Sequence, residues 1–172
     1  MAIDYLCDRE SKSVKSVILS STLSSAKMLE EEQYRRISYM DKKDREAIYQ
    51  ARREGNYTDK NYIVAFDKFM EKYCSSKAGP NSTEYLIREK IGGKLAYLTG
   101  WGENEFIPQG SLSDFKYTDK LCQIKTKTLI MSGQMDLSSP YIGKILNDKI
   151  KNSTWHLFQY SRQFYRPKRR IL

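Results

Sequence analysis

An acidic side chain in this 172-residue chain lies where loop chemistry is expected. Thr128 to Met131 form an apolar run of strand length, which Ser132-Gly133 is predicted to break, and Asp136 follows. Loops just past the carboxyl ends of strands in α/β sheets collect catalytic groups, because the strand fixes the position while the loop leaves the side chain free. Taken alone, the stretch favours a simpler role in which Asp136 only caps the turn.

Histidine and cysteine side chains offer little further chemistry. His156 is the only histidine, and it falls inside a predicted strand, which indicates a structural or surface residue. The cysteines Cys7, Cys74 and Cys122 are odd in number and far apart, which is typical of reduced thiols. These residues have no metal-ligand spacing, so we expect neither a metal nor an organic cofactor.

The segments around Asp136 predict a βαβ unit. Pro140 is a first-turn proline for a helix over 141–149, and 154–158 reads as one more strand. A strand, a helix and a second strand in this order imply a parallel sheet. Near the beginning of the chain, 1–7 reads as a short helix with Ile3 and Leu6 on one side, and 14–20 reads as a β-branched strand.

The middle of the chain, from Ala26 to about Leu98, is helical in pattern. Helices are expected over 27–40 and 41–54, with Gly55 as the cap of the second. An N-cap at Thr58-Asp59 begins a helix that ends near Cys74. Its predicted packing face is an aromatic and aliphatic stripe of Tyr62, Ile63, Phe66, Phe69, Met70 and Tyr73. Helical character resumes over 83–98.

Composition indicates a folded protein rather than a disordered one, with 40% hydrophobic and 12% aromatic residues. No apolar run reaches the roughly 20 residues of a membrane span, and no signal peptide is recognisable, so we expect a cytoplasmic protein without membrane contact. The net charge of +9 is mostly interleaved with acids; the exception is RPKRR at 166–170. A short basic cluster binds anions without sequence readout, which weighs against nucleic acid as a partner.

Three segments carry a resemblance to a known family. They are WGENEF at 101–106, GSLSDFKYTDKLCQIKTKTLIMSGQMD at 110–136 and WHLFQYSRQ at 155–163. Together they resemble the C-terminal half of the proline iminopeptidases, which are α/β-hydrolase serine aminopeptidases that remove N-terminal proline. The resemblance extends back to VKSVILSSTLSSA at 14–26, and its motifs follow the order of the family.

The resemblance implies a partial α/β-hydrolase fold, in which a few parallel strands carry an inserted, all-helical cap. Residues 1–25 and 108–172 would be the remnant of the core, and 26–107 the cap. Asp136 matches the acid of the catalytic triad, which orients the catalytic histidine. Glu105 matches the carboxylate that pairs with the substrate's ammonium group, although Glu103 replaces the usual proline of that motif. A second acid is expected from the cap, and Glu84 is our candidate.

Other parts of the catalytic machinery are missing from the sequence. No G-x-S-x-G nucleophile elbow occurs, so the reactive serine and the oxyanion loop that precedes it are absent. The family's histidine is expected at position 163, where this chain has Gln163. A glutamine amide does not titrate near neutral pH and cannot act as a general base. His156 lies seven residues earlier, inside a strand, and cannot easily substitute for it.

Three interpretations follow. The chain is either a C-terminal fragment of a proline iminopeptidase that is inactive alone, or one half of a split hydrolase whose missing N-terminal half supplies the serine. The third interpretation is a non-enzymatic, basic helical module that binds a partner through its helices and its RPKRR tail. For the first two, the substrate would be a peptide with N-terminal proline. Few strands, open sheet edges and an uncovered apolar sheet face are expected in every case.

Overall fold

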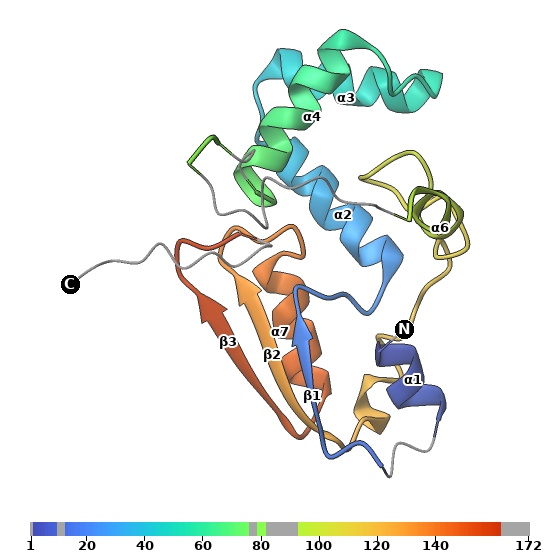
Figure 1. Cartoon of the computed structure of the whole chain (residues 1–172), viewed down its shortest axis with the longest axis vertical. Coiled ribbons are helices and arrows are strands. Elements are labelled where there is room, and N and C mark those ends of the chain that lie inside the picture. The colour runs from blue at the N-terminus through green and yellow to red at the C-terminus, as the bar shows by residue number, and fades with distance from the viewer. Residues whose placement is uncertain (1, 10–12, 76–78, 82–92, 163–172) are drawn as a thin grey trace, which may run out of the picture.

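The computed structural model describes residues 2–9, 13–75, 79–81 and 93–162. Helices and strands alternate at both ends of the chain, and helices fill its middle (Figure 1). In chain order the elements are α1 (Ala2–Asp8), β1 (Ser16–Ser20), α2 (Ala26–Ile37), α3 (Lys42–Glu54), α4 (Lys60–Tyr73), α6 (Lys94–Gly100), the short 3-10 helix η1 (Leu121–Gln123), β2 (Lys127–Gly133), α7 (Pro140–Lys149) and β3 (Ser153–Phe158).

The three strands form one parallel sheet in the order β1-β2-β3. The register places Leu19 of β1 opposite Ile130 of β2, and Ile130 opposite Trp155 of β3. Pro140 begins α7, which connects β2 to β3. The predicted βαβ unit and parallel sheet are therefore confirmed.

One face of the sheet carries the first hydrophobic core. Leu19 and Ile130 pack there with residues of α1 and α7, among them Leu6 and Leu146. The opposite face is largely open: Ile18, which pairs with Leu129, is 64% exposed. Parallel sheets normally have both faces covered. The expected uncovered apolar face is thus present among the described residues.

A second core lies beyond the carboxyl ends of the strands, where α2, α3 and α4 form a helical layer (Figure 1). Its buried members from the helices are Ile37, Ile48, Ala51, Tyr62, Ala65, Phe69 and Tyr73. Two members come from outside the layer: Phe106, and Leu137 from the loop that follows β2. This loop therefore lies between the sheet and the helical layer.

The boundaries predicted for the helix over 41–54 and for the helix from Thr58-Asp59 to Cys74 agree closely with α3 and α4. The helix predicted over 27–40 ends earlier, at Ile37, and the first part of the helix predicted over 83–98 lies outside the described residues. Gly55 ends α3 in the left-handed region with φ of 64°, and the side chain of Asp59 accepts the amide protons of Asn61 and Tyr62 at the start of α4. One residue of the predicted stripe is wrong: Ile63 is 45% exposed, and Ala65 is buried in its place. Ile63 is one residue from Tyr62, so it is rotated by about 100° from the centre of the packed face.

Ser132 and Gly133 do not break the strand, contrary to the sequence prediction. Both residues extend the ladder, opposite Leu157 and Phe158 of β3. The Ser132 hydroxyl accepts a hydrogen bond from the indole N–H of Trp155 at 2.8 Å. Small side chains are needed here for close packing, so the dipeptide that resembles a turn signal is the end of a crowded strand.

Gly133 gives a first testable consequence of this crowding. A Cβ atom at this position would lie 2.5 Å from the carbonyl oxygen of Ser161, which is backbone and cannot rotate away. We expect Gly133→Ala to lower the free energy of unfolding by about 1–3 kcal/mol. Gly79→Ala is the control, because a methyl group there meets nothing within 4 Å. Urea unfolding measures both variants, and equal midpoints would contradict this account.

Candidate active site

Asp136 is fully buried in the loop between β2 and α7, with 0% exposure. Its Oδ2 atom accepts hydrogen bonds from the backbone N–H of Gly133 at 3.1 Å and from the Ser21 hydroxyl at 2.5 Å. Its Oδ1 atom accepts from the backbone N–H of Ser138 at 2.9 Å. Asp136 therefore caps its own turn, as the simpler interpretation predicts. It also accepts a hydrogen bond from the Ser21 hydroxyl at the end of β1.

Within the described part of the chain, these contacts leave one acceptor position of the Asp136 carboxylate unused. A carboxylate has roughly four acceptor positions, and the three donors described above occupy three of them. Burial raises the pKa of Asp136, while its three hydrogen bonds and the nearby charge of Arg36 act in the opposite direction. Such a carboxylate is suited to binding a further N–H donor, for example an imidazole.

Ser21 is a site residue that sequence reasoning missed. It follows β1 directly and has φ of 47°, a left-handed conformation that is uncommon for serine. Its backbone N–H donates to Met131 of the adjacent strand, and its carbonyl accepts from the Ser138 hydroxyl at 3.3 Å. Parallel strands end at the same edge of a sheet, so a polar residue directly after the first strand was the available signal.

Glu105 lies in a turn that is anchored on both sides by buried residues. The side-chain amide of Asn104 donates to the Tyr57 hydroxyl at 3.0 Å, and Phe106 is buried in the helical-layer core. The Tyr97 hydroxyl donates to the Glu105 carboxylate, and the indole N–H of Trp101 donates to the backbone carbonyl of Glu105 at 3.1 Å. Glu105 is thus a half-buried carboxylate held by two aromatic side chains.

Burial also raises the pKa of Glu105, and the hydrogen bond from Tyr97 opposes this effect. The carboxylate is therefore poorly solvated and would be stabilised by a cation beside it. Tyr97 is affected in the same direction, since burial and the adjacent carboxylate raise the pKa of its hydroxyl.

The structure places Asp136 and Glu105 beside the same core. Leu137, next to Asp136, and Phe106, next to Glu105, both belong to the helical-layer cluster. The buried thiol of Cys74 lies within electrostatic range of both carboxylates, and burial together with these two negative charges raises its pKa. Asp136 and Glu105, which are far apart in the sequence, therefore lie beside the same hydrophobic core.

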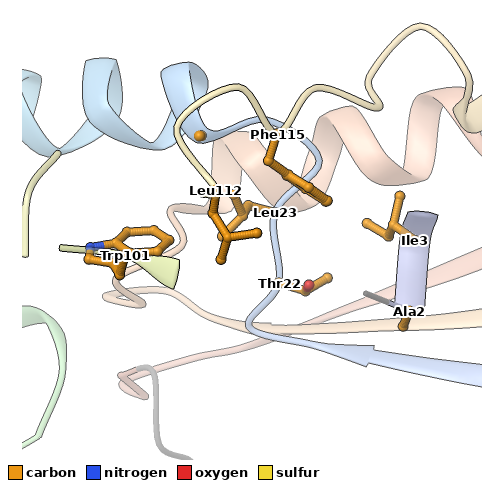
Figure 2. Close-up of a pocket in the computed structure, with 8 residues that line it drawn as sticks. Ala2, Ile3, Thr22, Leu23, Trp101, Leu112 and Phe115 are labelled. Atoms are coloured by element: carbon orange, nitrogen blue, oxygen red, sulfur yellow. The ribbon is translucent and has the colours of Figure 1, made fainter. Parts of the chain in front are cut away.

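An apolar pocket adjoins this region (Figure 2). It is lined by Ala2, Ile3, Thr22, Leu23, Ala26, Trp101, Leu112 and Phe115. Trp101 lies at one end of the pocket, and the residues of α1 lie at the other. Thr22 follows Ser21 in the sequence, and the Ser21 hydroxyl donates to Asp136. At the Trp101 end, the indole N–H donates to the backbone carbonyl of Glu105.

Some of the remaining sequence candidates lie among the described residues, and the others lie outside them. His156 is exposed on β3, with its ring 4.3 Å from that of Phe158, in agreement with a surface role. Cys7, Cys74 and Cys122 form no disulfide within the described part of the chain. Gln163, Glu84 and the RPKRR cluster lie outside the described residues.

Two further findings concern the described part of the chain as a whole. No group of three or more His, Cys, Asp or Glu side chains there is arranged to hold a metal ion. None of the helices described has the length and apolarity required to cross a membrane.

The raised pKa of Glu105 predicts a specific pH dependence of stability. In the pH range between the ordinary glutamate pKa and the raised value, the folded state binds more protons than the unfolded state, so stability falls as pH rises. We expect Glu105→Gln, which lacks this penalty, to unfold at a higher temperature than wild type at pH 7 and to lose this advantage near pH 4. A gain of 1 kcal/mol corresponds to about 2–4 °C for a domain of this size.

The exposed neighbour Glu103 provides the matched control for this measurement. Calorimetric scans from pH 4 to 8 on wild type, Glu105→Gln and Glu103→Gln separate the effect of burial from a simple change of net charge. An equal response of the two variants would show that burial of Glu105 does not affect stability.

Comparisons with known proteins show what the chain as a whole is similar to. No protein-family model matches the chain. Proline iminopeptidases from Clostridioides difficile and Clostridium botulinum are 50% and 44% identical to it over 161 residues, which are 94% of this chain and 55% of each relative. The chain thus spans about half the length of the curated relatives that it matches.

Solved structures show the same fold at lower sequence identity. A proline iminopeptidase from Mycobacterium smegmatis superposes with a TM-score of 0.76 at 19% identity, and VinJ with a TM-score of 0.78 at 18% identity. In both cases the match covers 94% of this chain and 54% of the solved chain. The three parallel strands and their helices are therefore part of an α/β-hydrolase fold. With up to 50% identity over nearly all of its residues, the chain is a homologue of about half the length of the proline iminopeptidases.

Proposed function

We propose that this chain is the C-terminal portion of a proline-iminopeptidase-like serine aminopeptidase, which hydrolyses N-terminal proline from peptides. In this proposal Asp136 is the triad acid and Glu105 binds the substrate's ammonium group. The observation that carries the proposal is the buried Asp136 carboxylate, which accepts three hydrogen bonds from the described residues. It is supported by an apolar pocket lined by Trp101, whose indole N–H donates to the backbone carbonyl of Glu105.

Each described residue has a distinct task in the proposed reaction. Asp136 accepts the N–H of an imidazole and so holds the tautomer that takes a proton from serine. The apolar pocket excludes water and accommodates a pyrrolidine ring. Glu105 pairs with the charged amine, which compensates for the burial that raises its own pKa. Since the serine, the oxyanion donors and the histidine are absent from the sequence, this chain alone does not complete the reaction.

The proposed division into core (1–25 and 108–172) and cap (26–107) is supported by the hydrogen bonds where the chain enters and leaves the helical layer. The backbone N–H of Ala26 donates to the carbonyl of Phe115 at 2.9 Å, and that of Tyr117 donates to Ser24 at 2.7 Å. The two crossings are thus side by side, as an inserted segment requires. The three cysteines form no disulfide within the described residues, which agrees with the reducing compartment expected for a cytoplasmic protein.

We further propose that the site is completed by a polypeptide equivalent to the part of the relatives that this chain does not match. The edge strand β1 and the open sheet face around the 64% exposed Ile18 support this proposal, because a larger sheet would continue at that edge and further elements would cover that face. Such a segment would contribute the serine and the oxyanion hole. The alternative of a basic binding module would leave this edge and the buried carboxylates without a role.

Reconstitution tests the proposed function. The chain with Gln163→His is co-expressed with the unmatched portion of the C. difficile relative, and hydrolysis of proline 4-nitroanilide is measured in the purified complex. We expect hydrolysis that is blocked by a serine-directed reagent, and none with N-acetylproline 4-nitroanilide, which lacks the charged amine. A complex that forms but leaves both substrates intact would contradict the proposal.

A further inference from the structure

Helix α2 carries an unusual buried polar surface. Glu32, Gln33 and Arg36 lie on one side of the helix and are 7%, 1% and 5% exposed, respectively. Charged residues are seldom buried unless they have partners. The partners of these three side chains are therefore informative.

All three side chains contact the loop that bears Asp136. The Arg36 guanidinium donates from Nη1 to the backbone carbonyl of Asp136 and to that of Leu137, the latter at 3.2 Å. The Gln33 side-chain amide donates to the same Leu137 carbonyl at 3.1 Å. The Ser139 hydroxyl donates to the Glu32 carboxylate. Residues 136–139 are thus held from α2 at three groups, namely the carbonyls of Asp136 and Leu137 and the hydroxyl of Ser139.

One peptide group connects these contacts to the Asp136 carboxylate. The peptide between Leu137 and Ser138 donates its N–H to Asp136 Oδ1 at 2.9 Å, while its C=O accepts from Gln33 and Arg36. A peptide group is planar, so its N–H and C=O rotate together. Any rotation that removes the carbonyl from α2 also turns the N–H away from the carboxylate.

We propose that Gln33 and Arg36 are positioning residues for Asp136: by fixing the Leu137–Ser138 peptide, they set the orientation of the carboxylate from the helical layer. Arg36 is itself fixed, since its guanidinium lies 4.5 Å from the centre of the Tyr73 ring in α4. A displacement of α2 against the sheet would therefore change the orientation of the Asp136 carboxylate through this single peptide group. The role of Asp136 in catalysis rests on the proposed function, but the hydrogen-bond linkage does not.

Charge and position have to be separated, because Arg36 acts on Asp136 in both ways. Its positive charge favours the ionised carboxylate directly, as do the hydrogen bonds from Ser21, Gly133 and Ser138. Other ionisable groups near this peptide are Glu32, which pairs with Arg35, and the Cys74 thiol. Gln33 carries no charge, so Gln33→Met removes only the hydrogen bond and keeps a side chain of similar length.

The test measures Asp136 directly in the full chain by nuclear magnetic resonance. The pKa of Asp136 comes from titration of its carboxyl carbon, and the strength of the Ser138 N–H bond from hydrogen exchange. In Gln33→Met and Arg36→Met we expect a higher Asp136 pKa and a Ser138 exchange rate faster by roughly a factor of five to ten, the change for the loss of about one hydrogen bond. Exchange in the centre of β2 should be unchanged.

Arg52→Met is the matched control. The Arg52 guanidinium lies 4.6 Å from the centre of the Tyr34 ring and pairs with Glu30, whereas its contacts within the described residues do not include the loop at 136–139. It should therefore leave both Asp136 readouts as in wild type. If Arg36→Met does not fold, Gln33→Met decides the question alone.

A folded Gln33→Met protein with unchanged Asp136 pKa and unchanged Ser138 exchange would overturn the proposal. A change of the same size in Arg52→Met would also overturn it, because the effect would then be general. Neither readout involves catalysis, so failure here would leave the proposed peptidase role of Asp136 intact. Conversely, an inactive reconstituted complex would not affect the positioning result.

Discussion

Replacement of Asp136 with asparagine in the reconstituted peptidase is expected to lower kcat for proline 4-nitroanilide by about 10⁴-fold, the size of effect known when a triad aspartate becomes asparagine. The carboxylate accepts three hydrogen bonds from Ser21, Gly133 and Ser138. An asparagine side chain has one oxygen and one NH₂ group. Its NH₂ group would therefore face one of these three donors or the imidazole N–H, and two donors cannot form a hydrogen bond with each other. The histidine would then be held in the wrong tautomer.

Asp119→Asn is the control for this change, because Asp119 is an exposed aspartate in the same half of the chain. The variants are compared by steady-state kinetics, and their unfolding temperatures are measured in parallel to show that both are folded. A loss of less than tenfold in a folded Asp136→Asn complex would mean that Asp136 is not the triad acid.

Truncation of Phe106 is expected to cause the largest loss of stability. Phe106 is 1% exposed and meets the ring of Phe69 edge-on, with centroids 5.0 Å apart, and that of Phe66 at 5.8 Å. Removing such a ring from a packed core costs about 3–5 kcal/mol, against a total of about 5–15 kcal/mol for a typical domain. Phe106→Ala should therefore reduce the unfolding temperature by roughly 10 °C.

This substitution also tests how Glu105 is held. Phe106 accompanies Glu105 in the turn and anchors it in the helical-layer core, so its truncation should loosen the carboxylate from Tyr97. Ile63→Ala is the control, because Ile63 is 45% exposed and lies outside the packed face of α4. If the two variants lose similar stability, Phe106 is not an anchor of this core.

The sequence was sufficient to predict those elements whose signals are local. Pro140 begins a helix because its fixed φ suits the first turn, and Gly55 ends one because it adopts a left-handed φ without strain. The apolar run after Thr128 identified the central strand. The dipeptide Ser132-Gly133 was misinterpreted because its small side chains serve contacts with Trp155 and Ser161, which are distant in sequence.

The same distinction applies to the site. Asp136 was placed by its position after a strand and by family resemblance, and Glu105 by resemblance alone. The partners of both acids were not predictable, since Ser21 and Tyr97 are recognisable only when the fold brings them close. The charged residues of α2 have the composition of a solvated helix face. Gln33 and Arg36 are buried because carbonyl groups of the Asp136 loop require donors.

The most direct test of the central claim is the rate of proline release from proline 4-nitroanilide by this chain alone, at high protein concentration and after repeated purification. The claim is that Asp136 and Glu105 belong to a site whose nucleophile lies outside this sequence. It predicts no hydrolysis above the buffer blank. A steady turnover that persists through purification and disappears in Asp136→Ala would contradict it, because the chain would then contain a nucleophile of its own.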